Sequence, residues 1–274
     1  MKIRAVLFDL DETLIAEESS NDAAAIAACA LAADRHGIDD AALFRAMREQ
    51  SLALWLGGPM IDYCRNIGIS SREGLWGAFS SDDPGSAKLR DWIPEYRRRS
   101  WLDALRHLGI DDESLAAELA HAFMIERRAR HVVFSESRQV LHQLKRSHRL
   151  ALITNGASDI QREKIVGAGL APFFDAIVIS GSLGFGKPNP EIFATALRHL
   201  NVAPDETVMV GDSLSRDIEG ARTAGIKTIW INRFARPRHD PRKIERLDER
   251  DRYHAPDAEL IDLRQLPSII AGLD

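Results

Sequence analysis

Carboxylates, one lysine and one threonine lie at or just beyond the ends of four short apolar runs that have the pattern of buried strands. These polar residues are Asp9 and Asp11, Thr154, Lys187, and Asp212 and Asp217. Ligands of open parallel sheets bind at the carboxyl ends of the strands, so we expect the six side chains to converge at one edge of a sheet. Carboxylates at close range repel each other, and the cluster therefore requires a cation. Carboxylate oxygens without Cys or His partners favour Mg²⁺, which would keep coordination positions open for phosphate oxygens.

The alternative interpretation of these residues is structural. Asp and Asn often cap helices or stabilise turns where strands end. For any single strand end this explanation would be as good as a functional one. Because all four ends are polar at once, the sequence favours a site.

The apolar runs alternate with helical patterns along most of the chain. Strands are expected at 3–10, 150–154, 176–180, 207–210 and 228–231, with a possible short sixth at 258–261. Helical patterns occupy 140–146, 158–168, 190–200 and 216–224. This alternation predicts an α/β fold, a Rossmann-like doubly wound parallel sheet with helices on both faces.

Residues 16–131 have a different pattern. They contain no convincing strand, are rich in Ala, Leu, Arg and Glu, and are interrupted at glycines and prolines. We expect a helical domain over 16–131, inserted into a discontinuous α/β domain formed by 1–15 and 132–274. Two connections between the domains favour hinge motion.

The polar strand ends, in chain order, resemble the four motifs of the haloacid-dehalogenase-like (HAD) phosphatases. Residues 9–14 (DLDETL) resemble the D-x-D-x-T signature, and Thr154 matches the Ser or Thr of the second motif. Lys187 matches the third motif, and 211–217 match the G-D-x(4)-D form of the fourth. The helical insert directly after the first motif resembles the C1-type cap of subfamily I. The resemblance implies the HAD core fold with an inserted α-helical cap domain.

The resemblance assigns the chemistry to the first motif. Asp9 would be the nucleophile that forms an aspartyl-phosphate. Asp11 would protonate the leaving alcohol and then activate water as a base. Dehalogenases of the superfamily lack a carboxylate at the position of Asp11, so its presence here disfavours dehalogenation.

The resemblance assigns phosphate binding to Thr154, Asn155 and Lys187. Lys187 would also offset the charge of the nucleophile.

Metal binding is assigned to three positions near the strand ends. Asp212 would hold Mg²⁺ together with Asp9 and the backbone carbonyl of Asp11. Asp217 would bind the metal or support its ligands from behind.

The implied function is Mg²⁺-dependent hydrolysis of a phosphomonoester, a small phosphorylated metabolite such as a sugar phosphate, a nucleotide or a phosphoglycolate-like acid. Two alternatives remain open: a phosphomutase of the same superfamily, and a non-catalytic phospho-ligand binding protein on this fold. A P-loop at 181–187 (GSLGFGK) is rejected. That motif needs Ser or Thr after its lysine, and Pro188 follows here.

The composition sets limits on partners and location. The 274 residues are 45% hydrophobic and 28% charged, with a net charge of −5, which argues against nucleic-acid binding. The sequence lacks an apolar run of about 18 residues and a signal-peptide core, so we expect a cytoplasmic monomer or homodimer with no membrane contact. The charge-rich segment 233–252 is expected to be a solvated loop or surface helix. Its functional alternative is a basic lip that attracts an anionic substrate.

Overall fold

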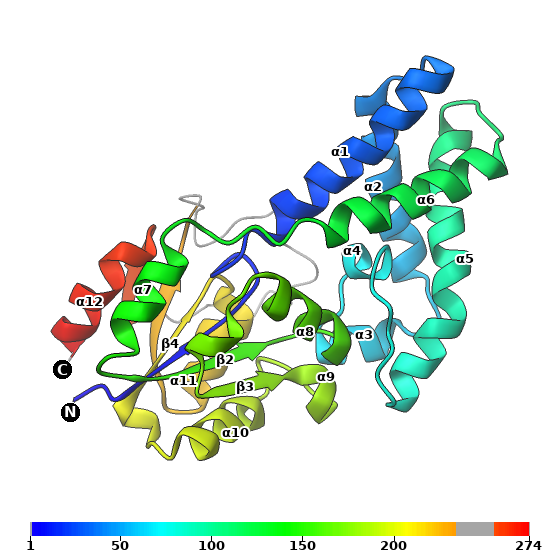
Figure 1. Cartoon of the computed structure of the whole chain (residues 1–274). Helices are drawn as coiled ribbons and strands as arrows, with labels where there is room; N and C mark the ends of the chain where they lie inside the picture. Colours follow the sequence, from blue (N-terminus) through cyan, green and yellow to red (C-terminus); the bar gives the residue numbers. More distant parts are fainter. Residues whose placement is uncertain (1, 234–254, 274) are drawn as a thin grey trace. The chain divides into compact units, whose positions relative to one another are not determined.

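The computed structural model describes residues 2–233 and 255–273, which form two compact units (Figure 1). Unit 1 comprises residues 1–15, 133–154 and 168–274, and unit 2 comprises 16–132 and 155–167. The sequence pattern predicts 155–167 in the α/β domain, but the structure places this segment in unit 2. The chain therefore passes between the units at four points, where the sequence pattern predicts two.

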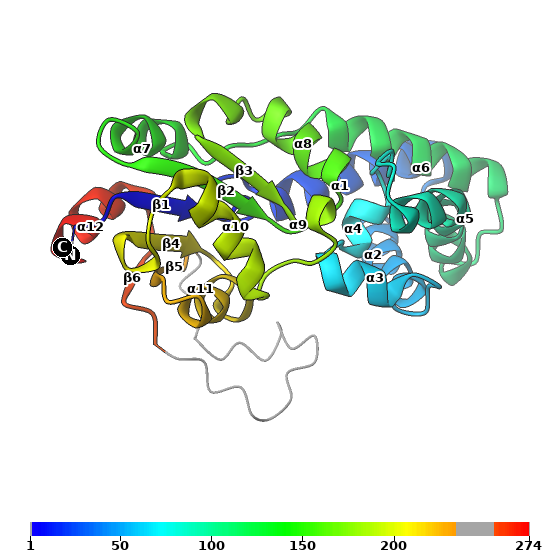
Figure 2. The same ribbon diagram turned by 90° about the horizontal axis from the view of Figure 1, so that it is seen from below.

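Unit 1 is built on a six-stranded sheet with the strand order β3-β2-β1-β4-β5-β6, in which every neighbouring pair is parallel. The strands are β1 (Ala5–Phe8), β2 (Arg149–Thr154), β3 (Ala176–Ile179), β4 (Thr207–Gly211), β5 (Lys227–Ile231) and β6 (Ala258–Leu260). Figure 2 shows β3, β2, β1 and β4 side by side. This order reverses direction beside β1, as in doubly wound folds, and confirms the predicted fold class. Crevices at such a reversal are where ligands bind.

Helices cover both faces of this sheet. They are α7 (Ser137–Leu144), α9 (Ser180–Leu183), α10 (Pro190–Leu200), α11 (Glu219–Thr223) and α12 (Leu266–Leu273), with the π-helical turn η3 (Leu214–Ile218) and the 3₁₀ turns η1 (Ala171–Phe173), η2 (Pro204–Glu206) and η5 (Leu263–Gln265). Alternate residues of a strand point to opposite faces. Ala5 and Leu7 of β1 belong to a core cluster with residues of α10 and α11, while Val6 and Phe8 point away from it and are fully buried as well.

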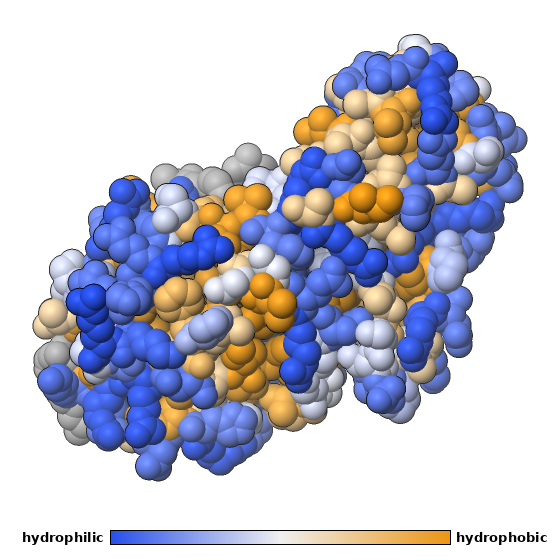
Figure 3. Space-filling view, viewed as in Figure 1, coloured by the Kyte–Doolittle hydropathy of each residue, from blue (hydrophilic) through white to orange (hydrophobic). Residues whose placement is uncertain are grey.

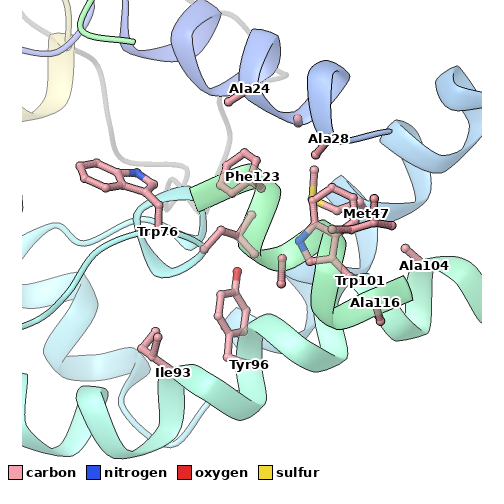
Figure 4. Packing of buried hydrophobic residues seen from close by; sticks show 14 of the residues in the cluster. Ala24, Ala28, Met47, Trp76, Ile93, Tyr96, Trp101, Ala104, Ala116 and Phe123 are labelled. Atoms are coloured by element: carbon pink, nitrogen blue, oxygen red, sulfur yellow. The ribbon is translucent and has the colours of Figure 1, made fainter. Parts of the chain in front are cut away.

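Unit 2 consists of helices around an aromatic core. They are α1 (Glu17–His36), α2 (Asp40–Leu56), α3 (Ile61–Ile67), α4 (Ser71–Gly74), α5 (Pro84–His107), α6 (Glu113–Arg128) and α8 (Ser158–Gly167). Figure 4 shows Trp76, Tyr96, Trp101 and Phe123 packed together with small alanines of α1. Small residues on α1 let the bulky rings of the neighbouring helices approach closely, which closes the core.

Buried charges hold α8 inside unit 2. Lys164 of α8 is fully buried, and its Nζ donates a hydrogen bond of 2.9 Å to Oε1 of Glu73 in α4. Gln161 of α8 donates to the same oxygen at 2.8 Å, and Lys164 also forms an ion pair of 3.2 Å with Glu17 of α1. A helix joined to two others by buried ion pairs cannot leave them without exposing or orphaning a charge. This explains why the segment 155–167 belongs to unit 2.

Arg127, at the end of α6, completes the same network. It forms an ion pair with Glu17 and donates a 3.1 Å hydrogen bond from Nε to Oδ1 of Asn21. Its guanidinium lies over the ring of Trp76, 4.7 Å from the ring centre. Burial by itself raises the pKa of Glu17, but the charges of Lys164 and Arg127 outweigh it, so the pKa is lowered and the carboxylate stays ionised.

The face drawn in Figure 3 carries many hydrophilic residues, with apolar residues between them, some single and some in groups. Folded proteins ordinarily expose part of their apolar surface in this way. None of the helices in the described part of the chain is long and apolar enough to span a bilayer.

The buried network predicts a large cost for removing its lysine. Lys164→Met should lower the free energy of unfolding by about 3–5 kcal/mol, because the buried Glu73 and Glu17 would each lose the ammonium that they contact. The measurement is urea unfolding followed by circular dichroism. Arg198→Met is the matched control, because its ion pair with Glu191 is 3.8 Å long and both side chains are 64% exposed. That change should cost less than about 1 kcal/mol, and equal losses in the two variants would contradict the role of the network.

Candidate active site

Asp9 directly follows β1 at the carboxyl edge of the sheet. Its backbone N–H donates to the carbonyl oxygen of Val210 at 3.0 Å, which extends the pairing of β1 with β4 by one residue. The residue is only 7% exposed. Burial raises the pKa of the carboxyl group, the nearby charge of Lys187 lowers it, and the net direction is upward. The site thus contains a buried carboxylate whose backbone is held by the sheet.

Residues 10–15 form a tight turn after Asp9. The Leu14 N–H donates to the carbonyl of Leu10 at 2.9 Å, and the Glu12 N–H donates to the carbonyl of Ile15 at 2.8 Å. Glu12 adopts a left-handed conformation with φ of 59°, which closes the turn. Asp11 is half-buried on this turn, two residues after Asp9.

Lys187 is the cation at the centre of the site. Its Nζ donates to Oδ1 of Asp9 at 2.6 Å and to the carbonyl of Ile153 at 2.9 Å, and it lies 2.7 Å from Oδ1 of Asp217. The residue is 5% exposed. Burial by itself lowers the pKa of Lys187, but the charges of Asp217 and Asp9 outweigh burial and raise it. The ammonium therefore stays charged while buried.

Three carboxylates meet beside this lysine. Asp9, Asp212 and Asp217 each offer an oxygen within 4.8 Å of the others, a spacing that suits one metal ion. The loop that carries the last two is fixed by its own hydrogen bonds. The Ser213 N–H donates to Oδ2 of Asp217 at 2.9 Å, and the indole N–H of Trp230 donates to the carbonyl of Asp212 at 2.8 Å. A donor set of carboxylates alone fits Mg²⁺.

Thr154 and Asn155 lie at the end of β2, but in different units. Thr154 belongs to unit 1 and is buried at the end of the strand that neighbours β1. The carbonyl of the preceding residue, Ile153, is the one that accepts from Lys187. Asn155 belongs to unit 2, where its side chain packs against Gly68 so closely that a Cβ on that glycine would lie 2.7 Å from the Asn155 Cβ.

The structure thus places the predicted residues in three groups. Asp9, Lys187, Asp212 and Asp217 come together, and Thr154 and Asp11 lie on a neighbouring strand end and on the adjoining turn. Asn155 belongs to the other unit.

Arg233 is a residue that sequence reasoning missed. The pattern predicts it in a solvated segment, 233–252, and for Arg233 this is wrong. Its guanidinium is buried against Glu136 and the carbonyl of Thr13. The rest of the segment, 234–252, lies outside the described residues, so the basic lip is not tested. The signal that could have found Arg233 is its place directly beyond the end of β5, at the edge that holds the other site residues.

A glycine makes the close packing of the site possible. A Cβ at Gly211, the last residue of β4, would lie 2.4 Å from Cγ of Asp217. Gly211→Ala should therefore displace that carboxylate and weaken Mg²⁺ binding about 10–100-fold, the usual range for residues that orient metal ligands. Isothermal titration with Mg²⁺ measures this affinity. Gly272→Ala is the control, because a Cβ there meets nothing within 4 Å. The same Mg²⁺ affinity in both variants would refute the assignment of Asp217 to the metal site.

Comparison with known proteins identifies the family. A sequence model described as hydrolase, haloacid dehalogenase-like hydrolase, matches residues 3–225. The phosphoserine phosphatase of Thermus thermophilus is 37% identical over 96% of this chain and 98% of the relative. The glyceraldehyde 3-phosphate phosphatase of Methanopyrus kandleri is 30% identical over 99% of this chain and 98% of the relative.

A solved structure shares the fold at lower sequence identity. The HAD-hydrolase YfnB of Bacillus subtilis superposes with a TM-score of 0.62 over 98% of this chain and 99% of that one, at 23% identity. The family match and the two phosphatases, similar over nearly their whole length, confirm the prediction that the chain is an enzyme and a phosphatase. The chain belongs to the haloacid dehalogenase-like hydrolase family.

Proposed function

We propose that this chain is a Mg²⁺-dependent phosphomonoester hydrolase that acts on a small phosphometabolite through an aspartyl-phosphate on Asp9. The observation that carries the proposal is the buried contact of Lys187 with Asp9 and Asp217, beside Asp212. A rigid carboxylate with an adjacent ammonium can attack a phosphoryl group whose charge the ammonium helps to neutralise.

The reaction has two chemical steps in this proposal. A carboxylate oxygen of Asp9 attacks phosphorus, the bond from phosphorus to the leaving oxygen breaks, and Asp11 gives its proton to that oxygen. Water then attacks the phosphorus of the aspartyl-phosphate, Asp11 takes a proton from that water, and the bond from phosphorus to the Asp9 oxygen breaks. Inorganic phosphate leaves, and Asp9 returns to its carboxylate form. The turn at residues 10–15 would hold Asp11 in place relative to Asp9 for these steps.

Phosphate binding uses the positive and hydrogen-bonding groups of the site. Lys187 would contact the phosphoryl oxygens as well as Asp9, and the Thr154 hydroxyl would donate a second hydrogen bond. Asn155, the residue after Thr154, is kept as a third phosphate-binding residue, as the resemblance assigns it. Such fixed donors stabilise the charge spread over the transition state.

Asp9, Asp212 and the Asp11 carbonyl would hold the Mg²⁺ ion. When bound, the ion would offset the charge of the phosphoryl group and of the carboxylates. We assign Asp217 to support and not to direct ligation, because its two oxygens already contact Lys187 and the Ser213 N–H.

Unit 2 is proposed as the cap domain that selects the leaving group. It is inserted directly after the first motif, as in a C1-type cap, and caps of this kind cover the reacting phosphate. The two relatives similar over their full length act on phosphoserine and on glyceraldehyde 3-phosphate, as their names state. These substrates support a small phosphomonoester for this chain. The cytoplasmic location and the monomeric or dimeric state stay predictions.

The nucleophile assignment makes the first functional prediction. Asp9→Asn should lower Mg²⁺-dependent hydrolysis of p-nitrophenyl phosphate by at least about a thousandfold, because the amide cannot form the covalent intermediate. The rate is measured with Mg²⁺ and with EDTA. Asp205→Asn, an exposed aspartate on η2, is the matched control and should keep wild-type activity. Full activity of Asp9→Asn would refute the mechanism. A folded wild type that binds Mg²⁺ but does not turn over would favour the binding-protein alternative.

The fate of the attacking water separates the remaining alternatives. Hydrolysis of p-nitrophenyl phosphate in H₂¹⁸O should place one ¹⁸O atom in the inorganic phosphate and none in the protein, because water attacks phosphorus. Mass spectrometry of the phosphate and of the peptide that contains Asp9 measures both. Label in the aspartate would mean attack at its carbonyl carbon, and transfer to an added sugar phosphate without release of phosphate would indicate a mutase.

A further inference from the structure

Arg233 is a buried cation outside the group of charges around Lys187. It follows β5, and its side chain is 9% exposed. Nη1 donates to Oε1 of Glu136 at 2.6 Å, Nη2 donates to the carbonyl oxygen of Thr13 at 2.7 Å, and the guanidinium lies 3.6 Å from the ring centre of Phe134. Two hydrogen bonds and one contact with an aromatic ring therefore hold the planar guanidinium of Arg233 in a single orientation.

The ion pair with Glu136 holds this arginine in place. Glu136 is 6% exposed, so its ionised form depends on the arginine. Burial by itself raises the pKa of Glu136, but the hydrogen bond from Arg233, with smaller contributions, outweighs burial and the pKa is lowered. The carboxylate therefore stays ionised, and a buried charge-assisted hydrogen bond of this kind is strong and directional.

The Thr13 carbonyl belongs to the turn that carries Asp11. Leu14 of the same turn accepts on its carbonyl from the Phe134 N–H at 3.1 Å and from the Ser137 hydroxyl at 2.9 Å. The turn is therefore fastened at two adjacent carbonyls. Arg233 contacts the carbonyl of Thr13, which is one residue closer to Asp11 in the sequence than Leu14 is. Its donor is charged, whereas the donors to Leu14 are neutral.

Arg233 also joins the two stretches of chain that flank the helical insert. Thr13 lies before residues 16–132, while Phe134 and Glu136 follow them, and the bridge between Ile15 and Val133 joins the same two stretches. All of these residues belong to unit 1. The contacts of Arg233 therefore lie within unit 1. They hold the turn at residues 10–15 whatever the position of the helical insert.

We infer that Arg233 is a positioning residue that holds the Asp11 turn in register for proton transfer to the leaving group. The inference rests on the proposed function, in which Asp11 is the general acid. Without Arg233, the Thr13 carbonyl would lose its charged donor and Glu136 would lose its cation. The turn would then sample positions in which Asp11 no longer reaches the leaving oxygen.

The test uses substituted phenyl phosphates that differ in the pKa of the leaving phenol. A phenol of low pKa departs without a proton, whereas a phenol of high pKa needs Asp11. In Arg233→Met, kcat/KM for phenyl phosphate should fall at least about tenfold more than kcat/KM for p-nitrophenyl phosphate. Because kcat/KM reports steps up to the first departure of the phenol, the later role of Asp11 as a base does not affect it. The plot of log kcat/KM against leaving-group pKa should become steeper.

Two reference variants define the scale. Asp11→Asn should show the same steepening in full, and Arg198→Met, an exposed arginine of the same unit, should show none. An equal loss of kcat/KM across the series in Arg233→Met, or no loss, overturns the inference, because a merely structural role does not discriminate between leaving groups. If Arg233→Met does not fold, Arg233→Lys replaces it. The lysine keeps a positive charge opposite Glu136 but lacks the planar guanidinium that donates to both Glu136 and the Thr13 carbonyl. The same steepening is therefore expected, and an equal change across the series again overturns the inference.

Failure of the proposed function has a different signature. A wild type without Mg²⁺-dependent hydrolysis, or an Asp11→Asn variant without steepening, would refute the assignment of Asp11 and remove the basis for the inference with it. Expected behaviour of the wild type and Asp11→Asn together with an unchanged slope in Arg233→Met would refute the role of Arg233 alone.

Discussion

The site depends on one buried ammonium. Lys187 contacts Asp9 at 2.6 Å and Asp217 at 2.7 Å, at a point where the sheet brings a third carboxylate, Asp212, within reach. Without this charge the carboxylates would repel each other in surroundings that screen them poorly. Other local features follow from the need to pack charges so closely. Gly211 has no side chain because Asp217 occupies its place, and the Ser213 N–H fixes the far oxygen of that carboxylate.

The parallel sheet is what brings residues so distant in the chain to this ammonium. Phe8 of β1 is in register with Leu152 of β2 and with Val210 of β4. β1 ends at Phe8, β4 continues one residue further to Gly211 and β2 two residues further to Thr154, so the residues at and beyond these ends lie at one edge of the sheet. This is why the sequence could predict that they come together: the buried strands are short apolar runs, and in a parallel sheet their carboxyl ends share one edge.

Long-range pairing of charges is what the sequence could not predict. The helical pattern of 158–168 fits an α/β domain, and only contacts with residues distant in sequence, such as the ion pair of Lys164 with Glu73, 91 residues away, place α8 in unit 2. Arg233 has the same difficulty, because its carboxylate partner is 97 residues away and the residues that follow it in sequence are rich in charge, a composition that predicts a surface segment. The sequence alone predicts a surface position for an arginine, because it does not reveal the carboxylate that would pair with it in the interior. Local patterns predict elements, whereas the partners of buried charges depend on the completed fold.

The three clusters of buried charge differ in how their carboxylates are partnered. In unit 2, Glu17 and Glu73 both contact Lys164, and Glu17 also contacts Arg127, while Glu136 contacts Arg233, so each of these buried carboxylates has a basic partner.

At the edge of the sheet, the described residues place three carboxylates, Asp9, Asp212 and Asp217, within 4.8 Å of one another beside Lys187. Burial raises the pKa of Asp9, and the charge of Lys187 does not fully offset this. Repulsion among carboxylates at such short range is relieved by protonation or by a cation, so a divalent cation would stabilise the ionised cluster. The crowding of three carboxylates at one edge of the sheet is thus the feature of the fold that supports the Mg²⁺ site of the proposed function.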